Sequence, residues 1–393
     1  MSKIIFQILG ATWLGTVVAG NHAIAQNWVS NNVPNLGWSS LANSASGNVI
    51  ILATGNYGPI YTSTNFGGSW TSNTLPNCAW GSVACSADGT KLVAVGQSSY
   101  QVGAAFVSTN SGVSWAQTGM PFAAEYEIVA SSADGTKMVL VGWNNPIYTS
   151  TNSGTTWTAI PGTSDQYTTV ASSADGTTLL AAGWNTSGIY VSTNAGAAWT
   201  LHSVPFNSWT ASACSADGSE MVVSGADLPL FISVNSGNTW QEVTNAPLTG
   251  WAGFALTANG SIIASYATNG ISDELIFYST NAGMTWSTNA APFSATLLAS
   301  SADGNRLIAV PDFEPVYTSY SPPSPILNIT SGNGLNLTWL VPSTNFVLQQ
   351  NFDLTTTNWM SLTNSPTLIF SNLENQVILS PTATSSCYRL ATP

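Results

Sequence analysis

The side chains best suited to acid–base chemistry in this sequence are carboxylates in short segments between predicted strands. They are Glu125, Glu127, Asp165, Asp227, Asp273, Glu274, Asp312 and Glu314. A glycosidase needs two carboxylates across one cavity, about 5 to 9.5 Å apart. No two of these residues stand out as a pair by motif. Glycoside hydrolysis is therefore kept as a hypothesis, and no residue is named as catalytic.

Nucleophilic and metal chemistry find less support. His202 is the only histidine after residue 25, and a packed or surface role for it is favoured over a Ser-His-Asp triad. No group of residues has the spacing of a zinc site. We expect neither a metal nor a cofactor.

Aromatic residues form a stronger candidate site. Six of them recur 41 to 46 residues apart, and each opens an apolar stretch: Trp38, Trp80, Tyr126, Tyr167, Trp209 and Trp251. Packing between repeated units is the favoured interpretation of this series, and an aromatic-lined binding funnel is the alternative. Trp143 and Trp184 lie in predicted loops on the same side. They are the preferred ligand-binding candidates, because loop residues are less engaged in packing.

Two repeated motifs define the elements that must position these rings. The first is S-T-N-x-G-x-x-W, here called the box, which ends at Trp70, Trp115, Trp157, Trp199, Trp240 and Trp286. The second is S-A-D-G or a close variant, which starts at Ser44, Ser86, Ser132, Ser173, Ser215, Thr257 and Ser301. Asp-Gly between two apolar stretches predicts a tight β-hairpin. We therefore predict four short antiparallel strands in each repeated unit.

Seven such units predict an all-β fold, a seven-bladed β-propeller over residues 26–320. The last unit has three predicted strands and no box. The segment from Asn27 to Pro34 has the fourth-strand pattern, yet the first three strands of a unit do not precede it. We predict that this N-terminal strand completes the last blade and closes the ring, which removes an exposed sheet edge.

The two ends of the chain differ from the repeats. Residues 1–25 combine Lys3, an apolar stretch and Ala23-Ile24-Ala25, which predicts a signal peptide cleaved near Ala25 and a secreted, cell-surface or periplasmic protein. Residues 321–325, SPPSP, predict a stiff linker. Residues 326–393 contain about six predicted strands and are expected to form a small β-sandwich module.

Composition limits the partners. The chain has a net charge of −12 with only 5 Lys and Arg residues, so nucleic acid and anionic membranes are not expected partners. No segment after the predicted signal peptide is long and apolar enough for a membrane span. Cys78 and Cys387 are either free thiols or a pair, and the sequence leaves this open.

The box resembles the Asp-box of bacterial neuraminidase repeats, with asparagine in the place of aspartate at Asn65, Asn110, Asn152, Asn194, Asn235 and Asn281. The resemblance covers about residues 27 to 322 and implies a propeller like those of sialidases, photosystem II assembly factors and sortilin-type receptors. It also implies that the box is a structural turn on the face away from the ligand funnel. Sialidases bind the substrate carboxylate with three arginines, whereas this chain has only Arg306 and Arg389. We therefore predict that it is not a sialidase.

The tail resembles C-terminal modules ending in YRL on secreted bacterial proteins, which implies attachment or sorting.

Two functions from different classes remain. The first is a secreted, non-catalytic binding or scaffold propeller for a neutral glycan or a protein partner. The alternative is a glycoside hydrolase that acts on a neutral polysaccharide.

Overall fold

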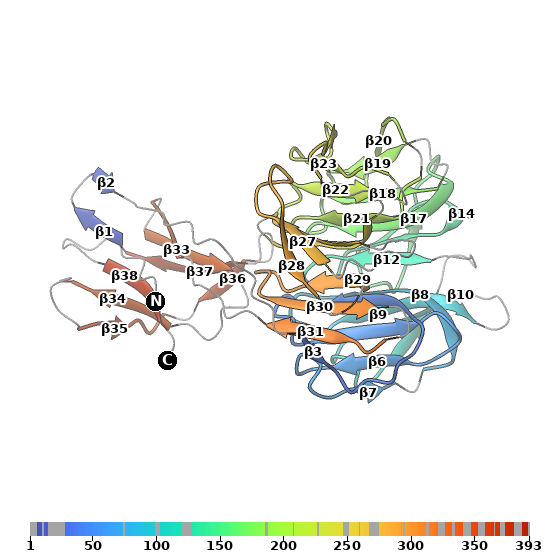
Figure 1. Ribbon diagram of the computed structural model, residues 1–393, viewed down its shortest axis with the longest axis horizontal. Helices are drawn as coiled ribbons and strands as arrows, with labels where there is room; N and C mark the ends of the chain where they lie inside the picture. The colour runs from blue at the N-terminus through green and yellow to red at the C-terminus, as the bar shows by residue number, and fades with distance from the viewer. Residues whose placement is uncertain are drawn as a thin grey trace.

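The computed structural model is a β-propeller with a smaller β-structure beside it (Figure 1). The structure describes residues 6–9, 12–14, 28–73, 75–98, 103–119, 127–184, 188–206, 208–225, 228–246, 251–258, 260–266, 275–291, 293, 295–311, 314–320, 327–331, 335–340, 347–352, 358–364, 366–369, 374–380 and 387–391. Every regular element among them is a β-strand. Within these ranges no helix is long and apolar enough to cross a membrane.

Each blade of the ring is an antiparallel sheet, and strands consecutive in the chain lie side by side in it. The first blade contains β4 (Trp38–Asn43), β5 (Ile50–Thr54), β6 (Ile60–Ser63) and β7 (Thr71–Ser72), and the second contains β8 (Cys78–Cys85), β9 (Leu92–Ser98), β10 (Gly103–Ser108) and β11 (Ala116–Thr118). The third contains β12 (Ile128–Ser131), β13 (Met138–Val141), β15 (Tyr148–Ser150) and β16 (Thr158–Ala159), and the fourth contains β17 (Asp165–Ser172), β18 (Leu179–Gly183), β19 (Ile189–Ser192) and β20 (Thr200–His202).

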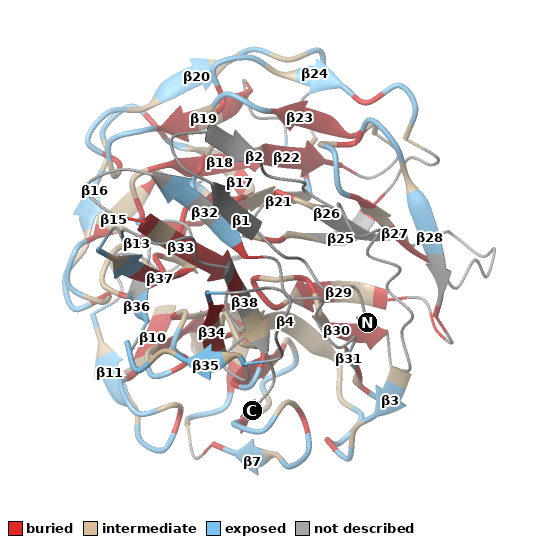
Figure 2. Cartoon of the chain, turned by 90° about the vertical axis from the view of Figure 1, so that its left-hand side faces the viewer, coloured by how far each residue is buried: buried red, intermediate tan, exposed pale blue. Residues whose placement is uncertain are grey.

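The remaining blades follow the same order. The fifth contains β21 (Ala211–Cys214), β22 (Met221–Ser224), β23 (Phe231–Ser233) and β24 (Gln241–Glu242), and the sixth contains β25 (Trp251–Leu256), β26 (Ile262–Tyr266), β27 (Leu275–Ser279) and β28 (Ser287–Ala290). The last contains β29 (Ala295–Ser300), β30 (Arg306–Pro311) and β31 (Tyr317–Tyr320), with β3 (Trp28–Ser30) as its outer strand. Figure 2 shows the outer strands β3, β7, β11, β16, β20, β24 and β28 at the rim.

The N-terminal strand β3 joins the two ends of the ring. Trp28 lies opposite Ser319 and Ser30 opposite Tyr317 in an antiparallel register with β31. Asn31 repeats the role that Asn73 has in the first blade, since its backbone N–H donates to the Val316 carbonyl at 2.8 Å. The fourth strand of the last blade is therefore supplied by the opposite end of the propeller sequence.

A chain of backbone hydrogen bonds links the S-A-D-G hairpins of neighbouring blades. The donor and acceptor alanines are Ala45 to Ala87, Ala87 to Ala133, Ala133 to Ala174, Ala174 to Ala216, Ala258 to Ala302 and Ala302 to Ala45, at 2.6 to 2.9 Å. The repeated alanine brings each hairpin close to the next one, and the bond from Ala302 to Ala45 connects the last blade to the first. Ala133, Ala174 and Ala216 also share one buried cluster, so a small side chain suits the place where the hairpins meet.

The hydrophobic core is divided among the interfaces between blades. Each buried cluster in the ring combines apolar residues from two successive sheets, as Trp80 and Ile60 do between the first and second blades. Another cluster joins the last blade to the first through Ile308, Val310 and Leu52. Because a strand is apolar on both faces here, its sheet must pack on both neighbours, which favours a closed ring over an open stack.

The tail contributes to two further sheets, and one of them also includes two strands from residues 1–25, the predicted signal peptide. One has the order β32 (Asn328–Ser331), β33 (Leu335–Leu340), β37 (Glu374–Leu379) and β36 (Thr367–Ile369). The other has the order β2 (Thr12–Leu14), β1 (Phe6–Leu9), β38 (Cys387–Ala391), β34 (Val347–Asn351) and β35 (Met360–Ser361). Residues from both sheets, including Trp339 and Tyr388, share one buried cluster.

Candidate functional site

The ring has two different faces. The boxes and the S-A-D-G hairpins lie on one of them, here called the box face, and the segments after the second strand of each blade lie on the other, the loop face. Strand β14 (Trp143–Asn145) marks the loop face. Figure 1 shows it on the side of the ring opposite the tail. The tail therefore leaves the loop face uncovered.

The box is a self-contained turn. In the third blade, the Ser150 hydroxyl donates to Asn152 Oδ1 at 3.0 Å and accepts the backbone N–H of Gly154 at 3.0 Å. Asn152 Oδ1 also accepts the N–H of Thr156 at 2.9 Å. Ser153 and Gly154 have positive φ angles of 56° and 77°. The polar side chains of Ser150 and Asn152 are thus used inside the turn, which agrees with a structural role for the box.

The box tryptophans pack between blades. Trp157 contacts the cluster shared by the second and third blades, and Trp240 contacts the one shared by the fourth and fifth. Trp28 holds the matching place between the sixth and last blades, where it lies edge-on to Phe293 with ring centroids 5.0 Å apart.

The basic residues of the ring lie on the box face and are engaged there. The Lys91 ammonium donates to the Asp134 carbonyl at 2.8 Å, and the Lys137 ammonium to the Asp175 carbonyl at 2.7 Å. Arg306 follows the same hairpin in the last blade. Its guanidinium lies over the rings of Phe66 and Tyr320 and donates to the Asn48 side chain. Through these hydrogen bonds and ring contacts, each of the three cations links one blade to the next.

Four of the five described first-strand aromatics are interior residues. Trp80, Tyr167, Trp209 and Trp251 are at most 2% exposed, and each belongs to the cluster shared with the preceding blade. Trp38 is partly buried at the junction with the last blade. Tyr126 lies outside the described residues.

Two of these rings are held by hydrogen bonds as well as by burial. Trp80 Nε1 donates to the Gly58 carbonyl at 3.0 Å, and the Tyr167 hydroxyl donates to the Thr163 carbonyl. Burial raises the pKa of the Tyr167 phenol, with smaller contributions from Tyr190 and Asp165. Their placement agrees with packing between blades, and a ligand does not reach them in this arrangement.

Trp143 and Trp184 differ from this series, because the structure brings them together on the loop face. Their ring centroids are 6.3 Å apart and their planes are inclined at 65°. Trp184 is 48% exposed, and Trp143 is partly exposed. We call them the tryptophan pair. They come from different blades, since Trp143 follows β13 and Trp184 follows β18.

A strand that leaves its own blade positions the first of these rings. After β13 the chain forms β14, which pairs with β17 of the fourth blade, so that Trp143 lies opposite Gln166 and Asn145 opposite Asp165. The carbonyl of Gln166 also accepts the backbone N–H of Trp184 at 2.8 Å. One residue of β17 thus fixes the backbones of both tryptophans. Trp184 is further bridged to Ser208 of the fifth blade.

Few of the candidate carboxylates belong to this site. Asp165 lies beside it, and its Oδ1 accepts the N–H of Gln166 at 2.9 Å. Glu127 is only 1% exposed, and Glu314 lies on the last blade, away from the tryptophan pair. Glu125, Asp227, Asp273, Glu274 and Asp312 lie outside the described residues.

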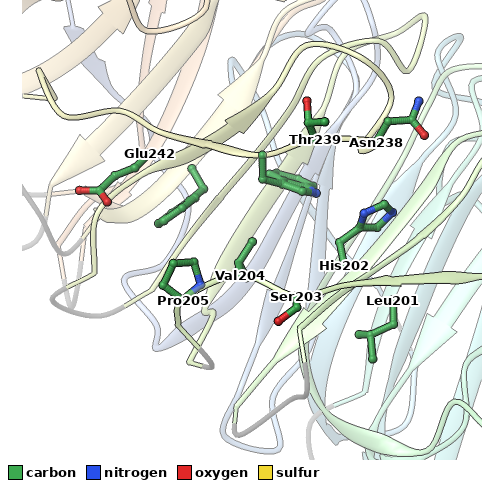
Figure 3. Close-up of a pocket in the computed structure, with 10 residues that line it drawn as sticks. Leu201, His202, Ser203, Val204, Pro205, Asn238, Thr239 and Glu242 are labelled. Atoms are coloured by element: carbon green, nitrogen blue, oxygen red, sulfur yellow. The ribbon is translucent and has the colours of Figure 1, made fainter.

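His202 lies in a separate pocket of about 460 Å³ at the rim, between the fourth and fifth blades. Leu201, Val204, Pro205, Phe231 and Trp240 form much of its wall. Burial lowers the pKa of the His202 imidazole. Figure 3 shows Glu242 on the opposite side of the pocket from His202. Among the described residues, no carboxylate is hydrogen-bonded to this imidazole, so the pocket lacks the arrangement of a triad.

The described thiols do not belong to a cluster of metal-binding side chains. Cys78, Cys85 and Cys214 are free, and no group of three or more metal-binding side chains occurs among the described residues. Burial, with a smaller contribution from Glu127, raises the pKa of the Cys78 thiol. The side chain of Cys387 is not described.

The comparisons with known proteins define the fold. No protein family matches the sequence, and no curated protein is similar to it. Among solved structures, a GH74 xyloglucanase from Xanthomonas campestris has a TM-score of 0.60 at 14% identity over 80% of this chain and 59% of its own. The GH74 enzyme of Niastella koreensis has a TM-score of 0.60 at 16% identity over 92% and 63%. YCF48 bound to a D1 peptide has a TM-score of 0.57 at 15% identity over 76% and 97%.

These similarities establish a β-propeller fold and nothing finer. The chain spans about 60% of the length of the GH74 enzymes that it matches. The matched proteins include both glycoside hydrolases and a protein that binds a peptide, so the fold alone does not choose between catalysis and binding.

Proposed function

We propose that this protein is an exported, non-catalytic β-propeller that binds a neutral glycan on its loop face. The observation that carries the proposal is the tryptophan pair, in which Trp143 and the half-exposed Trp184 meet from two blades. Exposed indole rings are costly to leave in water, and their faces suit the apolar faces of sugar rings.

The charge distribution supports a neutral ligand. Lys91, Lys137 and Arg306 are the basic residues of the ring, and all three are engaged on the box face. A carboxylate or phosphate on a ligand would therefore meet no ammonium or guanidinium on the loop face. Amide side chains are available beside the rings: Asn144 and Asn145 follow Trp143 in the sequence, and Gln166 lies opposite it in the register. Amides both donate and accept hydrogen bonds, as sugar hydroxyl groups require.

We infer that the ring has seven blades and that the boxes are Asp-box turns. Support comes from the buried clusters, which join every successive pair of sheets and also join the last sheet to the first. We further propose that residues 1–25 are a signal peptide and that residues 326–393 are a β-sandwich used for attachment or sorting. Deletion of residues 326–393 should release the protein from the cell surface without loss of loop-face binding.

Glycoside hydrolysis of a neutral polysaccharide remains the second candidate, favoured by the fold that this chain shares with the GH74 enzymes. Its weakness is the position of the described acids, since the Glu127 side chain is buried and the residue opposite Asp165 in the β14–β17 register is Asn145. A protein partner is the other alternative for the same loop face.

A glycan array combined with a reducing-sugar assay separates these functions. We expect binding of neutral glycans with no increase in reducing ends. New reducing ends that co-purify with the protein would support hydrolysis. Absence of binding to every glycan would contradict the proposal and would leave the protein partner as the better hypothesis.

A further inference from the structure

The two rings of the tryptophan pair do not form one flat surface. Their planes are inclined at 65° with centroids 6.3 Å apart. A sugar stacks on an aromatic ring when the two planes are close to parallel. A glycan whose consecutive rings share one plane, such as a β-1,4-glucan ribbon, is therefore able to stack on only one of these rings at a time.

The fold fixes the positions from which the two rings project. Trp143 is held by the pairing of β14 with β17, whereas Trp184 is held by its hydrogen bond to Gln166 and its bridge to Ser208. Three blades thus fix the two backbones. The two indoles also meet in an edge-to-face contact, which is a favoured geometry for an aromatic pair and keeps their planes inclined.

We propose that the tryptophan pair selects neutral glycans whose consecutive sugar rings are turned relative to one another, as in a curved β-1,3-glucan, over flat ribbons. This proposal rests on the proposed function and specifies its ligand class. One sugar stacks on Trp184, the more exposed ring, and a neighbouring sugar, turned by the linkage, meets Trp143. The hydroxyl groups between them face the amide side chains next to the pair, and no step of the recognition needs a charged group.

The choice of probes follows from this geometry. Laminarihexaose and cellohexaose have the same composition and length and differ only in linkage, so any difference in affinity reports the shape of the chain. Calorimetry with both sugars on the full propeller with its tail is the test. Laminarihexaose should bind at least several-fold more tightly than cellohexaose.

Single variants test whether both rings take part. Trp184→Ala and Trp143→Ala should each weaken laminarihexaose binding about 2- to 10-fold, and cellohexaose binding should depend on one ring at most. Trp143→Phe keeps an aromatic ring in β14 and should retain much of the affinity, which separates lost stacking from a misfolded loop. Thermal unfolding of each variant checks the fold.

The outcomes distinguish this inference from the proposed function. Cellohexaose binding as tight as that of laminarihexaose, with both rings contributing, would overturn the inference and leave a glycan-binding protein. A Trp143→Ala variant that folds and binds laminarihexaose as the parent does would also overturn it. If neither these sugars nor any neutral glycan on the array binds, the proposed function itself is wrong.

Discussion

The backbone N–H of Ala302 donates to the carbonyl of Ala45 at 2.9 Å, so a hydrogen bond joins the last blade of the ring to the first. On the rim of the last blade, β3 adds a second connection between the same two ends of the sequence. The ring is closed at its inner edge by backbone contacts and at its outer edge by a strand.

Ring closure predicts that Trp28 stabilises the whole propeller. Trp28→Ala removes a large ring from the cluster between the sixth and last blades and should cost about 3 kcal/mol, which lowers the melting temperature by several degrees. Val29→Ala is the matched control, because Val29 lies on the same strand but is 60% exposed. Equal melting temperatures for the parent and Trp28→Ala would contradict the closure account.

Substitutions in the box should lower the stability of the protein and leave its affinity for glycan unchanged. Asn152→Ala removes the acceptor for the Ser150 hydroxyl and the Thr156 N–H and should destabilise the protein by about 1 kcal/mol in denaturant unfolding. Asn152→Asp keeps an acceptor oxygen at this position and should be close to the parent. A loss of glycan affinity in folded Asn152→Ala would show that the box has a functional part.

The hairpin aspartates predict acid sensitivity. Partial burial acts to raise the pKa of the Asp134 carboxyl, but hydrogen bonds from Ser132 and Thr136 outweigh it, so its pKa lies below the ordinary value. Asp88, Asp175 and Asp217 share this pattern. A pKa lowered by folding contributes stability above the unfolded value of about 4, and this contribution is lost as the pH falls through the folded pKa. Denaturation midpoints should therefore drop between pH 5 and pH 3.

For Asp303 we predict the opposite dependence of stability on pH. Burial raises the pKa of its carboxyl above the ordinary value, against the hydrogen bonds from Ser301 and Asn305. Its contribution is full below the unfolded pKa and declines as the pH rises through the folded pKa. Asp303→Asn should therefore cost less stability at pH 7 than Asp134→Asn. The reverse order of the two denaturation midpoints would count against this account.

The engaged cations predict that the protein does not release sialic acid. Arg306 is placed between Phe66 and Tyr320 on the box face, and no second arginine is present in the ring. A fluorogenic sialoside should show no turnover with purified protein. Turnover that co-purifies with the protein would overturn this expectation, provided that a control protein without sialidase activity shows none.

The sequence predicted the propeller because the repeat reports contacts that recur in every blade. The Asp-Gly turns, the box and the pairing partner of Trp28 all follow from positions that each unit shares. The tryptophan pair is different. Its members were candidates because they lie in loops, but their contact depends on β14, which leaves the third blade and pairs with Gln166 in the fourth. No repeat signal marks that event, since it occurs once among the residues that the structure describes.

The rim pocket around His202 could not be predicted from the sequence either. Its wall combines Val204 and Pro205 of the fourth blade with Trp240 and Phe231 of the fifth, and a repeat describes one blade rather than the space between two. The burial of Trp80 and Tyr167 had a clearer sequence signal, because an aromatic residue that recurs in six of the seven units suits a contact that is repeated from blade to blade.

The central claim is that the tryptophan pair binds a neutral glycan, and affinity electrophoresis in gels containing neutral polysaccharides tests it most directly. The parent and the Tyr57→Ala control, which removes another exposed aromatic residue, should be retarded in at least one gel. The Trp143→Ala/Trp184→Ala double variant, shown to keep the parent's melting temperature, should lose about 5- to 100-fold in affinity and migrate freely. Equal retardation of the folded double variant, or no retardation of the parent in any gel, would contradict the account.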